Sequence, residues 1–148
     1  MEIRGSHGGY VLFTPLFVDL PGARVPMLSG SCSIAAHRFA GATEPDEPVV
    51  RIELARLRRF VDEVRVLERD RRGVATLVGP YLELSLSVYD RAGHVLLAAA
   101  LSDILPEGKY HVALAFEVDP TALPRILTDL ENLLAFPRAN ASPEERER

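Results

Sequence analysis

The segment from residue 108 to residue 136 constrains the fold most strongly, because its apolar period changes halfway along. Its first half alternates, and one side of the alternation is apolar: Tyr110, Val112, Leu114, Phe116 and Val118. A period of two is typical of a strand with one buried face. Its second half repeats at helical spacing, with apolar residues at Leu123, Ile126, Leu127, Leu130, Leu133 and Leu134. The segment therefore predicts a strand that leads through a short joint into an amphipathic helix.

The joint between them contains residues that locate the start of the helix. Pro124 has no amide hydrogen, so it suits the first turn, where amides lack a helical acceptor. Thr121 is a good N-cap residue and makes Pro124 the third helical residue. Asp119 and Pro120 are then expected to form a tight turn. Beyond Phe136 the chain is rich in Glu and Arg, and we expect residues 137–148 to form a frayed tail.

The same patterns predict the remaining elements. Alternation predicts strands at 10–19, 28–36, 49–52, 74–78, 81–89 and 94–101, the last of them central. Within the first strand, Pro15 indicates an edge position or a bulge. Helical spacing predicts a helix at 54–70, with Gly73 as the left-handed residue that ends it. Loops are expected at 41–48 and 103–109.

These elements define a fold class. Strands that follow one another through short turns pair antiparallel. Residues 1–136 therefore predict a single α+β domain, with one largely antiparallel sheet of about six to seven strands and two helices packed on one face.

The composition of the chain narrows the classes of partner that the protein can be expected to bind. The chain has 148 residues and a net charge of −4, which argues against a general binder of nucleic acid or of an anionic membrane. Cys32 is the sole cysteine, so an internal disulfide is excluded and a reducing cytoplasm is the natural setting. Cys32 alternates with core positions, which favours a buried structural thiol over a catalytic one. We recognise neither an export signal nor a membrane-spanning run.

Residues of reactive types do not assemble into a recognisable centre. His94 and His111 begin adjacent predicted strands and could be neighbours. The default interpretation is two solvated histidines, and the functional alternative is a metal-binding or proton-transfer pair. Serines on outer strand faces lack a Gly-x-Ser-x-Gly context: Ser29, Ser31, Ser33, Ser85 and Ser87. Arginines of the 54–72 segment are interspersed with acids, which favours an ion-paired face. We therefore expect no catalysis, no cofactor and no bound metal.

The order of several motifs resembles that of WapI-family immunity proteins. The strand-to-helix segment 118–130 is similar to their Asp-Gln-Thr-Tyr-Leu-Pro segment, although Pro120 and Ala122 stand in place of the Gln and Tyr. Upstream, the resemblance follows the alternating strand at 28 and continues through Phe39-Ala-Gly41, Leu57-Arg-Arg-Phe60, Gly73-Val-Ala, Leu82-Glu-Leu84 and Gly93-His94-Val95. It covers residues 28–136, and the 41–48 segment looks like an insertion.

The resemblance implies a small cytoplasmic protein that binds and blocks the toxin domain of a polymorphic secreted toxin, in some cases a nuclease. Such blocking requires a complementary surface and no catalysis. We expect the contact zone at Glu44, Asp46 and Glu47, which a proline-containing loop would present to a basic partner. The alternative is a small-molecule-binding or enzymatic domain that uses the open face of the sheet. A monomer and a weak homodimer both fit the sequence.

Overall fold

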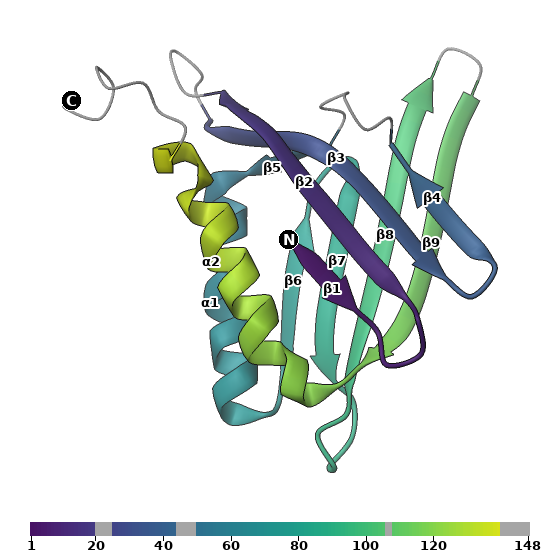
Figure 1. Cartoon of the computed structure of the whole chain (residues 1–148), viewed down its shortest axis with the longest axis vertical. Helices are drawn as coiled ribbons and strands as arrows, with labels where there is room; N and C mark the ends of the chain where they lie inside the picture. Colours follow the sequence, from purple (N-terminus) through teal and green to yellow (C-terminus); the bar gives the residue numbers. More distant parts are fainter. Residues whose placement is uncertain (20–24, 44–49, 106–107, 140–148) are drawn as a thin grey trace.

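The computed structural model describes residues 1–19, 25–43, 50–105 and 108–139. Within these residues the chain forms two antiparallel sheets and two α-helices, so the α+β class is confirmed (Figure 1). Each sheet is followed in the chain by one of the helices. None of the helices in this part of the chain is long and apolar enough to cross a membrane.

The first sheet, sheet A, is organised around a long central strand. Its order is β1-β2-β3-β4, and β5 pairs with the other end of β3 on the same side as β4. The strands are β1 (Glu2–Arg4), β2 (Tyr10–Asp19), β3 (Met27–Ala36), β4 (Phe39–Ala42) and β5 (Val50–Glu53). Of the two alternatives predicted for Pro15, an edge position or a bulge, the structure shows the second as a shift in the register of β2 against β3 between Pro15 and Phe17.

The second sheet, sheet B, is a meander in sequence order: β6 (Val74–Val78), β7 (Leu82–Val88), β8 (Val95–Leu105) and β9 (Gly108–Val118). β8 lies between β7 and β9, as predicted for the central strand. A short 3-10 turn (Pro120–Ala122) then leads into helix α2 (Leu123–Ala139).

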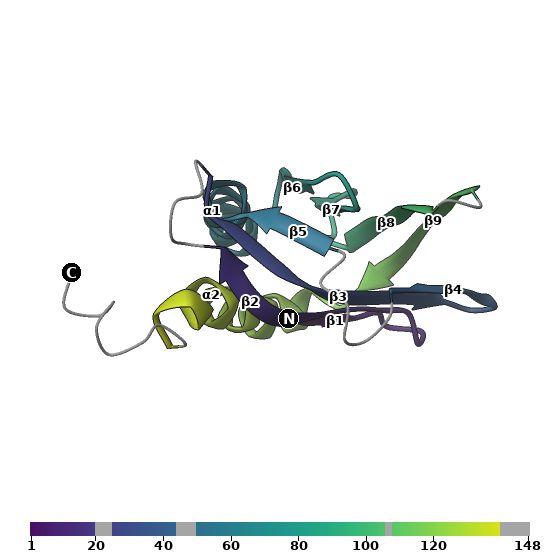
Figure 2. The same cartoon turned by 90° about the horizontal axis from the view of Figure 1, so that it is seen from above.

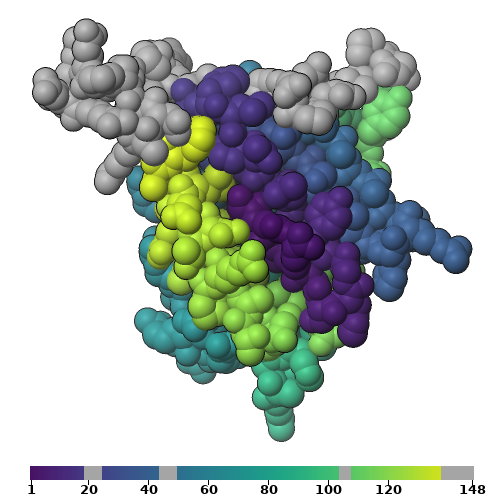
Figure 3. All heavy atoms as spheres, viewed as in Figure 1, coloured from purple at the N-terminus to yellow at the C-terminus, as the bar shows by residue number. Residues whose placement is uncertain are grey.

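The helices lie beside the sheets. Seen from above, α1 (Leu54–Asp70) continues the layer of sheet B, and α2 continues the layer of sheet A (Figure 2). α1 contacts mainly β6, while α2 contacts β1 and β2, and the two helices contact each other. Figure 3 shows α2 directly against the N-terminal strands. The core therefore fills the space between two mixed layers.

The predicted apolar faces supply most of this core, and Ile3 comes from β1, which was not predicted. In α1 the buried residues are Leu57, Phe60, Val61, Val64 and Leu67, and in α2 they are Leu123, Ile126, Leu130 and Leu133. From sheet B come Leu82, Leu84, Leu86 and Leu97, and from sheet A come Ile3, Val11, Phe13, Leu28 and Ile34. The periods of two and of 3.6 thus identified the buried faces correctly.

The prediction of one sheet with both helices on one face is wrong. Alternation shows that a strand has a buried side, but it does not show which strand lies opposite that side. Strands β1 and β4 were not predicted, and the first two residues of the expected 41–48 loop, Gly41 and Ala42, belong to β4. The 103–109 turn is also wrong, since β8 continues to Leu105 and β9 begins at Gly108.

Three helix boundaries differ from the prediction. Asp119, not Thr121, caps the joint, because its carboxylate accepts the amide hydrogen of Thr121 (2.9 Å). Helix α2 includes Pro137 and ends at Ala139, so the start of the predicted tail is helical. Arg71 ends α1 in the left-handed region (φ 52°), and its amide donates to the carbonyl of Leu67, whereas Gly73 has positive φ two residues later.

Ser29 and Ser31 were expected on a solvated face, but they are 0% and 9% exposed. The hydroxyl of Ser29 has no hydrogen-bond partner among the described residues. Ser85 and Ser87 are half-buried on the outer face of sheet B, where alternation placed them.

Phe116 is half-buried and packs against the β1–β2 connection. Ideal Cβ atoms built on Gly5 and Gly9 would lie 2.4 Å and 2.6 Å from carbon atoms of its ring, so both glycines are needed for this close approach. Val112 and Leu114 are also half-buried, and Val118 is fully buried. Tyr110, on the same face, is 50% exposed. The predicted register of β9 is therefore right, but burial increases only toward its C-terminal end.

We expect Phe116→Ala to lower the free energy of unfolding by about 2 kcal/mol. This is less than the roughly 3–5 kcal/mol typical of a fully buried phenylalanine, because part of the ring is already exposed to water. A urea titration measures the loss. A loss below about 0.5 kcal/mol would show that the ring does not pack against the β1–β2 connection.

A double-mutant cycle isolates this contact. Gly9→Ala should destabilise the wild type by roughly 1–3 kcal/mol and have a much smaller effect once Phe116 is alanine. Gly108→Ala is the matched control, since no neighbouring atom lies within 4 Å of its ideal Cβ.

Candidate functional site

None of the residues that the structure describes covers the outer face of sheet B, whose floor consists mainly of small side chains. Two neighbouring cross-strand rows form the floor: Thr76, Ser85, Ala98 and Ala115 in one, and Val78, Glu83, Ala100 and Ala113 in the next. Above them is a hollow of about 460 Å³, which we call the open-face hollow. Leu84, Ala99 and Leu114 also line it. The side chains of these three residues point to the opposite, inner face of the sheet, so the hollow is in contact with their main-chain atoms.

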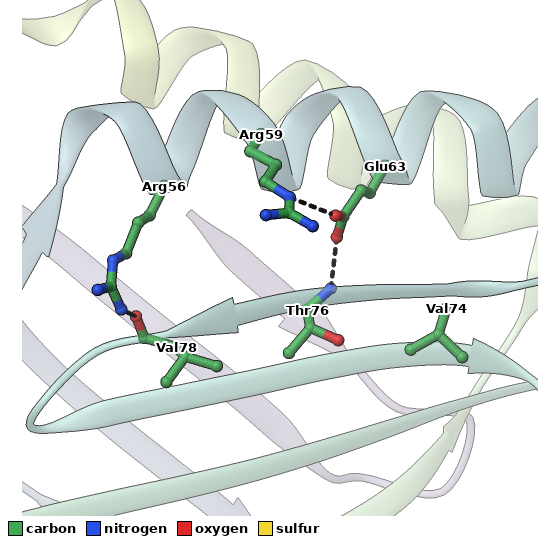
Figure 4. A pocket seen from close by; sticks show the side chains of 6 residues that line it. All are labelled: Arg56, Arg59, Glu63, Val74, Thr76 and Val78. Atoms are coloured by element: carbon green, nitrogen blue, oxygen red, sulfur yellow. Dashed lines mark hydrogen bonds and ion pairs between the residues drawn. The ribbon is translucent and has the colours of Figure 1, made fainter.

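A second hollow, the helix–strand groove, runs between α1 and the edge strand β6 (Figure 4). It measures about 470 Å³ and is lined by Arg56, Arg59, Glu63, Val74, Thr76 and Val78. Thr76 and Val78 also line the open-face hollow, so the two hollows adjoin along β6. The combined surface has a small-residue floor on one side and a charged wall of helical side chains on the other.

Side chains of α1 hold the wall in place by bonding to the outward backbone groups of β6. The amide of Thr76 donates to Oε2 of Glu63 (2.9 Å), and Nη1 of Arg56 donates to the carbonyl of Val78 (2.9 Å). Nε of Arg59 donates to the other oxygen of Glu63 (2.9 Å). An unpaired sheet edge invites association with other strands, and these contacts close this one.

The arginine-rich face of α1 is ion-paired, as the sequence indicated. Arg56 pairs with Glu53, and Arg59 pairs with Glu63. Arg65 pairs with Asp62 on the same helix and with Glu131 on α2. These exposed pairs contribute little stability individually, but Arg65 links the two helices.

The two candidate histidines are not neighbours. β8 and β9 are antiparallel, and His111 pairs with Ser102, whereas His94 precedes Val95, whose partner is Val118. His94 Nδ1 instead bonds the carboxylate of Asp90 and its ring stacks on Tyr89. This bond raises the pKa of His94 and lowers the pKa of Asp90. The sequence alternative of a metal or proton-transfer pair at these two residues is therefore wrong.

His111 does hydrogen-bond a serine: its Nδ1 lies 2.7 Å from Oγ of Ser102. A serine nucleophile also needs donors for the oxyanion, and these usually include its own amide. The amide of Ser102 is already committed to the carbonyl of Tyr81 (2.8 Å). The amide of Ser102 is therefore not free to serve as an oxyanion donor.

Cys32 is buried, 3% exposed, and unbonded to another cysteine. Burial raises the pKa of its thiol to about 12. Because the thiolate is the reactive form, a thiol with this pKa is inert near neutral pH. The structural role predicted for Cys32 fits this environment.

Other predicted site residues cannot be placed. Glu44, Asp46 and Glu47 lie outside the described residues. Within the described ranges, no three His, Cys, Asp or Glu side chains come together in a way that could hold a metal ion. The sequence named the open face of the sheet only for the alternative function and assigned no residues to it, although the small residues at alternate positions of β8 and β9 were a visible signal.

Comparisons with known proteins add little. No protein-family model matches the chain, and no curated protein matches it. A chain from the "Crystal structures of trypanosoma bruciei MRP1/MRP2" aligns with a TM-score of 0.41 and 13% identity, over 92% of this chain and 83% of that chain. A similarity this low supports no conclusion about what the present protein binds or does.

We expect Cys32 to resist alkylation in the folded protein. Raising the pKa from 9.0 to about 12 lowers the thiolate fraction at pH 8 by roughly a thousandfold, and burial adds a steric barrier. Iodoacetamide labelling followed by mass spectrometry should therefore be at least about a hundredfold slower in buffer than in urea. Equal rates in the two conditions would contradict the burial of this thiol.

Glu63→Ala should loosen the edge of sheet B. The amide of Thr76 loses its acceptor, and since water can replace it in part, the cost should be about 1 kcal/mol. Hydrogen exchange at the Thr76 amide should become faster. Glu68→Ala is the matched control, because Glu68 lies on the same helix and pairs with Arg71. Equal exchange at Thr76 in the two variants would show that Glu63 does not protect this edge.

Proposed function

We propose that this protein is a non-catalytic binding protein that contacts a protein partner through the open face of sheet B. The observation that carries the proposal is the open-face hollow, which adjoins the helix–strand groove along β6. Apart from Val78 and Glu83, the two rows of the floor consist of alanine, serine and threonine, which leave room for side chains that project from a partner. Val74 and Val78 are 57% and 46% exposed at its edge and offer apolar contact.

The charged wall supports the same proposal. Protein interfaces commonly combine an apolar centre with a polar rim that excludes water and fixes orientation. Here the rim is formed by Arg56, Arg59 and Glu63, whose mutual and backbone contacts hold them in place before binding. Such preorganisation lowers the entropy cost of association.

The class of partner comes from the sequence resemblance to WapI-family immunity proteins. We propose that this partner is the toxin domain of a secreted toxin, in some cases a nuclease, and that the complex forms in the cytoplasm. A small-molecule site on the same face is less well supported. Of the residues that line the open-face hollow, Thr76, Glu83 and Ser85 are polar, and the rest are apolar.

The test is coexpression with the toxin domain encoded beside this protein's gene. We expect the wild type to restore growth and to copurify with the toxin. Ala98→Arg should weaken binding at least about tenfold, because Ala98 is exposed at the centre of the floor. Ala92→Arg makes the same change at an exposed alanine in the β7–β8 turn, and it should leave binding intact.

The outcomes separate the parts of the proposal. If the wild type neither protects nor copurifies, the immunity function is wrong. If it protects and Ala98→Arg protects equally well, the open face is not the contact surface. In that case the triple variant Glu44→Ala, Asp46→Ala, Glu47→Ala tests the contact zone expected from the sequence.

A further inference from the structure

The open-face hollow has an apolar side and a mainly polar side. On β8 and β9, the residues of its floor are four alanines: Ala98, Ala100, Ala113 and Ala115. On β6 and β7, the floor includes, besides Val78, the hydroxyls of Thr76 and Ser85 and the carboxylate of Glu83. The boundary runs between β7 and β8, where Ser85 and Glu83 each pair with an alanine. An occupant that matches both sides must itself be apolar at one end and polar at the other.

The polar side presents hydrogen-bond acceptors that have no donor. Among the described residues, the side chains of Thr76, Ser85 and Glu83 form neither a hydrogen bond nor an ion pair. Glu83 is also the one charged side chain among the described residues that line this hollow. An ionised carboxylate only accepts hydrogen bonds, and its strongest donors are cations. The hollow therefore lacks a positively charged donor at Glu83.

The arginines of the neighbouring wall do not supply this donor. Arg56 pairs with Glu53 and donates to a backbone carbonyl of β6, and Arg59 pairs with Glu63 (Figure 4). Both arginines line the helix–strand groove, and neither lines the open-face hollow. Because each has an acidic partner of its own, the charges of the wall balance one another. The charge of Glu83 is left uncompensated.

Binding of a partner changes the environment of Glu83. In the free protein this side chain is exposed, so water solvates the carboxylate. A partner that covers the hollow removes this water, and an ionised carboxylate that is left unpaired in an interface is strongly unfavourable. The partner must therefore bring a donor to Glu83. A surface that places an acidic or a purely apolar group there is rejected.

We propose that the open-face hollow binds one arginine side chain of the partner, with its aliphatic stem on the alanines of β8 and β9 and its guanidinium at Glu83. This inference rests on the proposed function, since it names the chemistry that a protein partner presents to the same surface. The methyl groups of Ala98 and Ala100 contact the stem, as is common for arginine stems on apolar surface. The volume of about 460 Å³ is sufficient, since sites of roughly 300–1,000 Å³ hold whole small-molecule ligands.

Arginine fits this site better than lysine. Its planar guanidinium donates two parallel hydrogen bonds to one carboxylate and has further N–H groups to spare. These groups can reach the hydroxyl of Ser85, which follows Glu83 by two residues on the same face of β7. A lysine ammonium is more strongly hydrated, so its transfer into a covered hollow is less favourable. The partner is therefore expected to select against replacement of this arginine by lysine.

The first test does not require the partner. The probe is n-propylguanidinium, which reproduces an arginine side chain beyond Cα, in an NMR titration of the full chain labelled with nitrogen-15. We expect saturable shifts at the amides of Ala98 and Ala100, with a dissociation constant on the order of 10 mM. Glu83→Gln should raise this constant at least about fivefold. Glu68→Gln removes the same charge from a residue of α1 that lines neither hollow, and it should have no effect.

The second test uses the toxin domain encoded beside this protein's gene. Glu83→Gln should weaken its binding at least about tenfold, whereas Glu68→Gln should not change it. A thermal melt of each variant checks the fold. Double-mutant cycles then identify the arginine: each exposed arginine of the toxin is replaced by alanine and measured against the wild type and against Glu83→Gln. The loss of one arginine should weaken binding much less once residue 83 is glutamine.

The outcomes distinguish this inference from the proposed function. If the toxin binds the wild type and Glu83→Gln equally well, the arginine site is wrong and the proposed function stands. If the toxin does not bind the wild type, the proposed function is wrong, and the titration alone decides what the hollow accepts. Shifts that are absent, or that are equal with butyrate, a neutral or acidic occupant being then as good a fit, overturn the inference. Tighter binding of n-butylammonium than of n-propylguanidinium overturns the choice of arginine.

Discussion

Unpaired backbone groups at the edges of the two sheets are the constraint on which this arrangement depends. Each edge must find donors and acceptors in protein or in water. In each half of the chain, a helical carboxylate accepts an outward amide from the first strand of a sheet: Asp129 from Glu2, and Glu63 from Thr76. The helices are therefore held beside the sheets, where they extend the layers and do not cover the outer faces.

This placement creates the candidate binding surface. A helix lying across sheet B would have filled the outer face with large apolar side chains. Because α1 lies beside β6, that face is exposed, and its floor consists of small residues such as Ala98 and Ala115. The charged residues that close the β6 edge also form the wall of the helix–strand groove. Closure of one edge and formation of the surface thus share the same side chains.

The candidate site was less accessible from the sequence than the fold. The alternation in β8 and β9 indicates which side of each strand is buried, but it does not indicate a role for the alanines on the other side. Small residues form the floor of a hollow only when the pairing of separate strands places them in one row. His94 and His111 show the opposite case. Each lies near the start of its own strand, but β8 and β9 are antiparallel, so the two histidines lie toward opposite ends of the strand pair.

The sequence by itself determined both helices, the longer strands and most of their buried faces. Local periodicity is sufficient for this, because the side chains of Leu57, Phe60 and Val64 share one face of a helix, and those of Leu82, Leu84 and Leu86 share one face of a strand, whatever surrounds them. Only the tertiary structure decided that the strands form two sheets and that the helices lie at their edges. Those choices depend on hydrogen bonds and contacts between residues far apart in the chain, such as Glu2 with Asp129 and Glu63 with Thr76. No local pattern carries that information.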